Sequence, residues 1–99
     1  MALLRQGREA YNAKDYRRAE TLFRDAIVQD GLYAKAYLYL GHSLYKQGRG
    51  DEAVGAWRNA VQTGEGSEAA KEAEAKIRYF EQGLTRMVEH LEARVRQEP

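Results

Sequence analysis

Side chains that could carry out catalysis are few in this sequence and are badly spaced for it. The chain has two histidines, His42 and His90, two serines, Ser43 and Ser67, and no cysteine. Consecutive residues on a helix point about 100° apart, so the neighbours His42 and Ser43 would not face each other. The lack of cysteine removes thiolate nucleophiles, disulfides and zinc ribbons together.

Short motifs that hold metals or cofactors are also missing from the sequence. It contains no HExxH motif, no phosphate-binding loop and no GxGxxG motif. The Glu-x-x-His pair of di-iron bundles is absent, because Tyr39 stands three residues before His42 and Met87 three before His90. The sequence therefore predicts a protein that is not an enzyme and that uses no cofactor and no metal ion.

The composition predicts a single all-α domain over residues 1–99. Hydrophobic residues make up 43% of the chain, enough for one modest core, and charged residues make up 31%. Alanine, glutamate and arginine are abundant, whereas proline occurs once and β-branched residues are few. Such a composition favours helices over strands.

The charge balance and the first residues argue against two classes of partner. The 16 basic and 15 acidic residues leave a net charge of +1, which gives no reason to expect nucleic acid or a membrane surface as a partner. Charge soon interrupts the short apolar run after Met1, so we expect no signal peptide and no membrane-spanning helix. These features favour a cytoplasmic location, unless the chain is a fragment of a longer protein.

The sequence repeats itself at an interval of 34 residues. Seven of the first 33 residue pairs at this spacing are identical, against roughly two expected from ordinary residue frequencies. The identical pairs are Ala2/Ala36, Leu4/Leu38, Gly7/Gly41, Tyr11/Tyr45, Ala19/Ala53, Arg24/Arg58 and Ala26/Ala60. Most of these residues are small or apolar, which indicates that a packing pattern is repeated.

Each repeated unit is predicted to form two amphipathic helices, with repeat 1 at about residues 1–33 and repeat 2 at about 34–67. Apolar or small residues recur at helical spacing in four stripes. The stripes are Leu3, Gly7, Ala10 and Tyr11; Ala19, Leu22, Phe23, Ala26 and Ile27; Tyr37, Leu40, Gly41, Leu44 and Tyr45; and Ala53, Val54, Trp57, Ala60 and Val61.

Turn and cap residues separate these predicted helices. Asp15 and Ser67 stand where helix N-caps belong, with side-chain oxygens placed to accept free backbone N–H groups. We expect Asp30-Gly31 to end the first unit, with the glycine in the left-handed conformation. We expect Gly48 and Gly50 to interrupt the helix that begins the second unit.

The remaining segment, about residues 68–97, carries an unbroken apolar seam. Its members are separated alternately by three and four positions, and they are Ala70, Ala73, Ile77, Phe80, Leu84, Met87 and Leu91. We favour one helix over this whole segment, which would be about 45 Å long. The alternative is a break at Gln82-Gly83, which would make the segment a degenerate third hairpin.

This pattern resembles the tetratricopeptide repeat family, whose unit is a helix-turn-helix of 34 residues with small residues at its eighth, twentieth and twenty-seventh positions. The matching residues are Gly7, Ala19 and Ala26 in the first unit and Gly41, Ala53 and Ala60 in the second. Phe23 and Trp57 match the bulky twenty-fourth position. The resemblance implies an all-α superhelix of two repeat hairpins with a C-terminal capping helix, serving as a scaffold for protein binding.

Residues 68–97 match the family pattern only in part. Ala75 keeps the small eighth position, and Tyr79 continues the spacing of the repeated tyrosines. Met87 and Arg94, however, stand where small residues belong. The segment is therefore expected to be a capping helix or a degenerate third repeat.

The resemblance also implies a concave groove lined by the first helix of each repeat. The positions that match groove positions are Leu4, Arg8, Tyr11, Asn12, Lys35, Leu38, His42, Tyr45 and Lys46, joined by Glu72, Lys76 and Tyr79. The four cations in this set outnumber its single carboxylate, which predicts a peptide or protein partner that is acidic. The three tyrosines are expected to stack as a ladder. Neither asparagine of the family's carboxylate clamp for chaperone C-termini is present.

Three other features are expected to be structural rather than functional. His42 is expected to be a polar residue on the groove surface, with pH sensing as the alternative. Trp57 is expected to lie in the core, because it matches Phe23. The Arg17-Arg18 pair, which is close to acidic residues, is expected to lie on a solvated face.

The apolar residues beyond position 82 must be covered, because a contiguous apolar stripe is rarely left in water. They are Leu84, Met87, Val88, Leu91 and Val95. A fold-back at Gly83, a second copy of the chain in a symmetric dimer, or a further repeat would each bury them. The regular spacing favours an extended helix and a dimer, so self-association is the alternative function.

Overall fold

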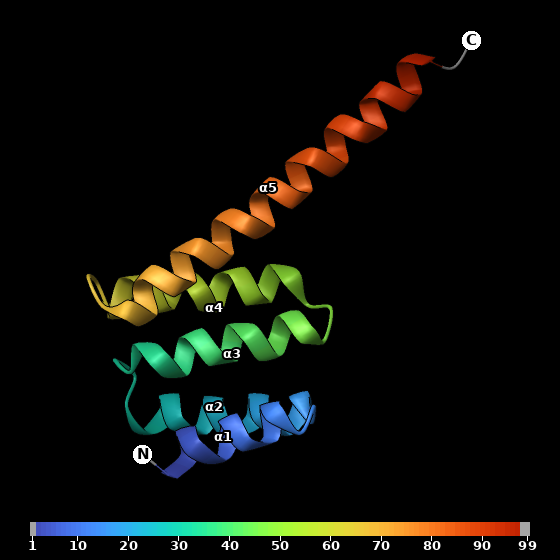
Figure 1. The fold of residues 1–99 in the computed structure, drawn as a ribbon. Helices are drawn as coiled ribbons and strands as arrows, with labels where there is room; N and C mark the ends of the chain where they lie inside the picture. The colour runs from blue at the N-terminus through green and yellow to red at the C-terminus, as the bar shows by residue number, and fades with distance from the viewer. Residues whose placement is uncertain (1, 98–99) are drawn as a thin grey trace.

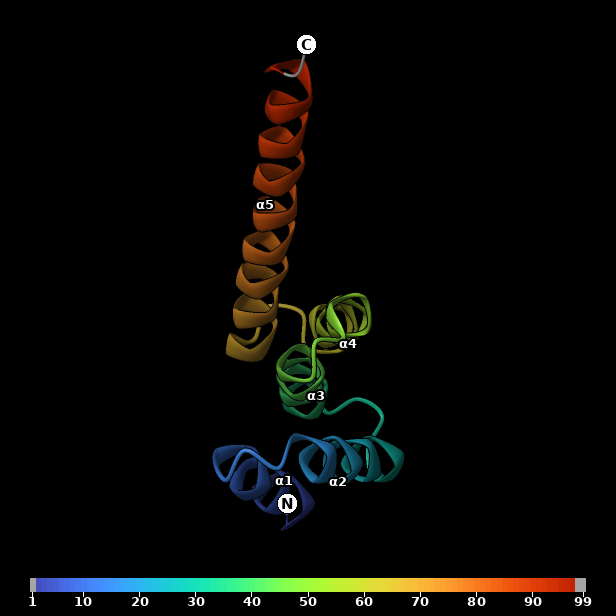
Figure 2. The same cartoon turned by 90° about the vertical axis from the view of Figure 1, so that its right-hand side faces the viewer.

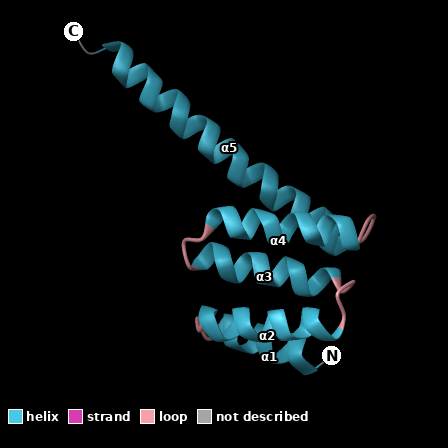
Figure 3. Cartoon of the chain, turned by 180° about the vertical axis from the view of Figure 1, so that it is seen from behind, coloured by secondary structure: helices cyan, strands magenta, loops and turns pink. Residues whose placement is uncertain are grey.

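Residues 2–97, the part of the chain that the computed structural model describes, form five α-helices and no strand (Figures 1 and 3). The helices are α1 (Ala2–Asn12), α2 (Tyr16–Gln29), α3 (Ala34–Lys46), α4 (Gly50–Thr63) and α5 (Glu68–Gln97). The predicted all-α class is confirmed. No helix in this range is both long enough and apolar enough to cross a membrane.

The helices form two antiparallel hairpins, α1–α2 and α3–α4, and α5 packs on the second hairpin (Figure 2). Helix α3 is the centre of the molecule, because it contacts each of the other four helices. Helix α5 runs obliquely across the stack, and its C-terminal half extends well past the hairpins (Figure 1). The molecule is accordingly elongated, with principal extents of 59 × 30 × 18 Å.

Small residues let the two helices of each hairpin approach closely, as the repeat pattern predicts. A Cβ atom added to Gly7 would lie 2.5 Å from the Phe23 ring, and one added to Gly41 would lie 2.3 Å from the Trp57 indole. Contacts this short cannot exist between carbon atoms, so each glycine is required by the aromatic ring that crosses it. The small positions of the second helices, which are Ala19, Ala26, Ala53 and Ala60, are fully buried.

The core fills the space between these close contacts. Its largest fully buried apolar side chains are Phe23, Leu38 and Leu44, and Trp57 is only 2% exposed. The expectation that Trp57 lies in the core is therefore confirmed. Leu38, by contrast, was expected to line the groove, and its burial shows that this assignment is wrong. Its side chain fills the core rather than facing a ligand.

Both predicted N-caps are present. The Asp15 carboxylate accepts a hydrogen bond from the backbone N–H of Arg18 at 3.3 Å. The Ser67 hydroxyl oxygen accepts one from the backbone N–H of Ala70 at 3.1 Å. Each bond satisfies a donor that the first turn of the helix leaves without an intrahelical partner.

Two turns differ from the sequence prediction. Gly31 is not left-handed. The Asp30 side chain instead accepts the N–H of Leu32 at 3.0 Å and closes the turn. Gly50 does not interrupt a helix but is the first residue of α4, where a Cβ atom would lie 2.7 Å from the Phe80 ring. The positive φ angles among the described residues are at Lys14, Gly48 and Gly66, each in a turn between helices.

Helix α5 is continuous from Glu68 to Gln97, so the predicted long helix is confirmed and the break at Gly83 is wrong. Ala69, Ala70 and Ala73 are buried in its first half, and Ile77 and Phe80 pack against the core. The same face continues into the second half, where it is left exposed in the part of the chain that the structure describes. Leu84, Met87, Val88, Leu91 and Val95 are 44% to 69% exposed there.

The outward face of the first half of α5 is polar. Lys71, Glu74 and Arg78 are exposed there, and they stand 34 residues after Tyr37, Leu40 and Leu44, which pack in or against the core. A terminal helix of a repeat array needs a polar outer face, because no further repeat covers it. Because charged residues occupy these equivalent positions in α5, this part of the helix is suited to face water.

A polar network ties the first repeat to the turn of the second. Glu20 on α2 accepts hydrogen bonds from Gln47 Nε2 at 3.0 Å and from Arg49 Nη1 at 2.7 Å. Arg24 bonds the other carboxylate oxygen at 3.0 Å. Burial raises the pKa of Glu20, but the bonds from Gln47, Arg24 and Arg49 together bring it below its ordinary value. The network therefore links the two hairpins.

Candidate binding groove

A hollow of about 220 Å³ opens between the first helices of the repeats and α5. Four helices contribute to its wall, and the lining residues are Tyr11 from α1; His42, Tyr45 and Lys46 from α3; Trp57 from α4; and Lys76, Tyr79 and Phe80 from α5. Six of these eight side chains are aromatic, and none carries a carboxylate. The hollow therefore combines apolar walls with two positive charges.

The aromatic rings form a connected wall. Tyr45 lies between Trp57 and Phe80, with centroid distances of 5.9 Å and 6.3 Å. His42 contacts Trp57 at 5.9 Å and Tyr11 at 6.4 Å. These distances and the tilted or edge-on geometries are typical of favourable aromatic pairs. The wall runs without interruption from α1 to α5.

The tyrosines do not stack on one another, so the predicted ladder is wrong in its detail. Among the described residues, no ring contact joins Tyr11 to Tyr45 or Tyr45 to Tyr79. Equivalent positions of neighbouring helices lie about 8–10 Å apart, whereas ring pairs need centroids within about 7 Å. His42 and Trp57 instead connect Tyr11 to Tyr45 by ring contacts, and Tyr45 contacts Phe80.

His42 is not the surface residue that the sequence suggested. Its side chain is only 13% exposed, and its Nδ1 atom accepts a hydrogen bond from the Trp57 indole N–H at 3.3 Å. Because an indole nitrogen only donates, Nδ1 must be unprotonated and the proton must lie on Nε2. That atom is 3.7 Å from the Glu72 carboxylate. The histidine thus holds the Trp57 ring in place.

The electrostatics of the site favour neutral rings. Burial lowers the pKa of His42, the charge of Glu72 opposes that shift, and Lys76 adds to it. Burial, with a smaller contribution from Tyr16, raises the pKa of the Tyr11 hydroxyl. At neutral pH the positive charge of the lining residues therefore comes from Lys46 and Lys76.

The structure brings together six of the twelve predicted groove residues, which are Tyr11, His42, Tyr45, Lys46, Lys76 and Tyr79. Arg8 does not line the hollow, and its guanidinium lies 5.4 Å from the centre of the Tyr39 ring. Asn12, Lys35 and Glu72 are exposed but do not line the hollow. Leu4 and Leu38 are in the core, so their assignment to the groove is wrong.

Sequence reasoning missed two residues of the wall, Trp57 and Phe80. Each was assigned to packing, and each does pack, but one edge of each ring also faces the hollow. A usable signal existed for Phe80, because it follows Tyr79 directly and stands four residues after Lys76. No comparable signal existed for Trp57, whose helix is not expected to face the groove.

A comparison with known families identifies this architecture. The model of the tetratricopeptide repeat family matches residues 4–70. The chain belongs to the tetratricopeptide repeat family. The match extends over both hairpins and the beginning of α5, and a comparison with curated proteins found no match.

Membership of the tetratricopeptide repeat family explains where the hollow lies. Repeat arrays of this kind present an extended concave surface to their partners, and such repeats mediate protein–protein interactions. Helices α1 and α3 are the first helices of the two repeats, and α5 occupies the place of a third. These are the helices that supply seven of the eight lining side chains.

Proposed function

We propose that this chain is a non-catalytic interaction module that binds an acidic peptide or protein segment across α1, α3 and α5. The observation that carries the proposal is the hollow itself, with aromatic walls, Lys46 and Lys76 in its lining, and no lining carboxylate. A partner with acidic residues would find complementary charge there.

The other charges at the predicted groove positions support an acidic partner. Arg8 and Lys35 are also exposed on α1 and α3, and Glu72 is the one acidic residue among the predicted groove positions. The groove thus concentrates positive charge in a chain whose net charge is only +1. Exposed charges of this kind chiefly speed association and set specificity, so raised salt is expected to weaken binding.

The exposed tyrosines supply contact area. Tyr79 is 75% exposed and Tyr45 is 46% exposed, so both rings can be covered by a ligand. Tyrosine contributes a large apolar surface at a small entropic cost, and its hydroxyl can bond a polar group of the partner.

A selection experiment tests this proposal without knowledge of the natural partner. A displayed library of random peptides is selected on the full chain, on a Lys46→Glu/Lys76→Glu variant, and on a Lys14→Glu/Lys71→Glu variant with the same change in charge. We expect the first and third proteins to enrich acidic peptides and the second to lose them. Enrichment of basic peptides, or the same peptides on all three proteins, would contradict the proposal.

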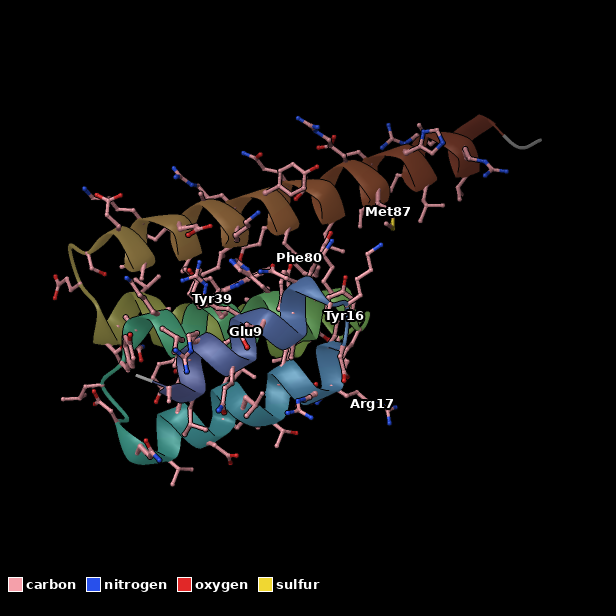
Figure 4. All side chains as sticks on the ribbon, turned by 60° about the horizontal axis from the view of Figure 1, so that its bottom comes forward. Glu9, Tyr16, Arg17, Tyr39, Phe80 and Met87 are labelled. Carbon is pink, nitrogen blue, oxygen red and sulfur yellow. The ribbon has the colours of Figure 1, made fainter. Side chains whose placement is uncertain are left out.

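A second candidate function is self-association through α5, and the exposed stripe favours it. Phe80 and Met87 project from α5 toward the same side (Figure 4), and Phe80 is packed whereas Met87 is 59% exposed. Leu84, Val88, Leu91 and Val95 are spaced four, three and four residues apart. The order of these spacings is the same in both directions along the helix.

Two antiparallel copies would therefore match residue for residue. Leu84 of one copy would meet Val95 of the other, and Val88 would meet Leu91, as a two-fold interface requires. Sedimentation of the chain beside Leu91→Glu tests this, with Ala93→Glu on the opposite face as the control. A dimer that only Leu91→Glu dissociates supports self-association, and a full chain that is monomeric at hundreds of micromolar contradicts it.

A further inference from the structure

We infer that the hollow between α1, α3, α4 and α5 anchors one large apolar side chain of the ligand, and that a carboxylate next to this side chain pairs with Lys46 or Lys76. This inference rests on the proposed groove-binding function and names the motif that the groove would read. The size, the lining, the charge and the rigidity of the hollow support it.

The size of the hollow suits a single side chain. A cavity of about 150 Å³ with apolar walls is large enough for benzene, and this hollow measures about 220 Å³. It can therefore admit one aromatic or long aliphatic side chain, while a stretch of backbone must stay outside. Tyr45 and Tyr79 lie at its margin, where they are exposed to solvent.

The lining decides which side chain enters. Aromatic walls can bind cations through their ring faces, but Lys46 and Lys76 already place two positive charges in this lining. A lysine, an arginine or a methylated amine would meet repulsion from both. A neutral apolar group meets none, and its burial against the rings is favourable.

The two lysines also set the polar part of the motif. Lys46 belongs to α3 and Lys76 to α5, so they approach the hollow from two different helices. When the anchor residue of a ligand enters the hollow, the residues next to it lie over the opening, close to these two lysines. An Asp or Glu beside the anchor would then meet an ammonium group, whereas a Lys would be repelled.

The part of the wall that Trp57 forms is held in place before a ligand binds. The Trp57 indole donates to His42 at 3.3 Å, and its ring lies directly across Gly41, so it has little freedom to turn. A preformed hollow spares the ligand the cost of ordering the protein. It also makes Trp57, which is the single tryptophan of the chain, a fluorescence reporter of occupancy.

A set of short acidic peptides tests the inference on the full chain. The central residue is varied through Phe, Leu, Ala and Lys with constant acidic flanks, and one further peptide keeps Phe but replaces the flanking Glu residues with Gln. Binding is followed by calorimetry and by Trp57 emission. We expect Phe and Leu to bind at least about tenfold tighter than Ala, which is the effect of burying one such side chain. We expect Lys to bind more weakly than Ala.

Matched variants assign the two parts of the motif. Lys76→Gln should weaken the Glu-flanked Phe peptide and leave the Gln-flanked one unchanged, while Lys71→Gln on the outer face of α5 should change neither. Tyr79→Ala tests whether the margin of the hollow contributes to binding. Its exposed ring contributes little to the fold, so the variant should remain folded.

The outcomes separate this inference from the proposed function. If all the acidic peptides bind equally and Trp57 emission does not respond, the anchor motif is wrong although an acidic groove remains. If the Gln-flanked Phe peptide binds as tightly as the Glu-flanked one, the carboxylate part is wrong. If no peptide of the set binds at millimolar concentration, the proposed acidic-peptide function itself fails.

Discussion

Gly41 and Gly55 lie on adjacent helices, and a side chain would have opposite effects at the two positions. A Cβ atom at Gly41 would lie 2.3 Å from the Trp57 ring, whereas one at Gly55 would meet nothing within 4 Å. Gly41 is thus required by packing. Gly55 is an exposed glycine inside α4, where it only lowers helix propensity.

We expect alanine to destabilise the first position and stabilise the second. Gly41→Ala forces a methyl group into Trp57, which is buried and cannot retreat, and overpacking of this kind costs about 1–3 kcal/mol. Gly55→Ala should gain up to about 1 kcal/mol of helix propensity. Thermal melts of the two variants should shift in opposite directions, and a Gly41→Ala melt equal to that of the natural chain would contradict the packing described here.

The free energy of unfolding should depend on pH because of the lowered pKa of His42. Because burial lowers its pKa from an ordinary value near 6.5, the folded state binds fewer protons than the unfolded state in the range between the two values. The stabilisation is therefore complete above pH 6.5 and is lost as the pH falls through the folded pKa. Protonation of Nδ1 would also break the bond from Trp57.

Urea unfolding at pH 7.5 and at pH 5.5 checks this prediction. We expect the natural chain to lose stability at the lower pH and His42→Gln to lose less. His90→Gln, at an exposed position of α5, should behave like the natural chain. Equal pH dependence in the natural chain and His42→Gln would show that His42 is not responsible.

At the residue scale, the sequence predicted what spacing determines and missed what ring orientation determines. The small and bulky positions were recognised because one 34-residue pattern repeats both. The burial of His42 and the contribution of Trp57 to the hollow were not recognised, because they depend on how far each ring reaches across a neighbouring helix. A spacing pattern places a residue on a face but does not say which edge of its ring stays open.

At the scale of elements, α5 combines two different surfaces in one helix. Its first half buries alanines against the second hairpin and presents charged residues outward. Its second half carries the same apolar face into solvent. The 3-4 spacing predicted this continuity, since the seam passes through Gly83 without a change of register. The expectation at Gly50 was wrong because this glycine serves as a small residue under the Phe80 ring. The expectation at Gly31 was wrong because the Asp30 side chain closes that turn.

Gly83 should be a weak point of α5 rather than a hinge that the fold needs. It is exposed and helical, and a Cβ atom there would meet nothing within 4 Å. Gly83→Ala should therefore increase the helicity of α5 by about 1 kcal/mol of propensity, and Ala93→Gly should decrease it by a similar amount. Circular dichroism at 222 nm measures both changes. A loss of helix in Gly83→Ala would mean that the glycine has a role that the structure does not explain.

At the scale of the whole molecule, the positive groove and the apolar stripe are separate surfaces. The groove lies between α1, α3 and α5. The stripe lies on the C-terminal half of α5, which is the part of the helix that extends past the hairpins (Figure 1). The net charge of +1 does not reveal the basic groove, because acidic residues elsewhere in the chain offset its positive charges. The repeat pattern predicts where the groove lies, but the chemistry of its hollow depends on four helices meeting, which no single repeat contains.

The central claim is that an acidic ligand binds the concave groove, and an NMR titration tests it most directly. The isotopically labelled chain is titrated with an acidic peptide carrying a central Phe, and amide shifts are followed along the sequence. We expect the largest changes around Tyr11, His42, Tyr45, Lys46 and Tyr79, with a response of the Trp57 indole N–H. Changes concentrated on the outer faces of α2 and α4, or on residues 84–95 alone, would contradict it.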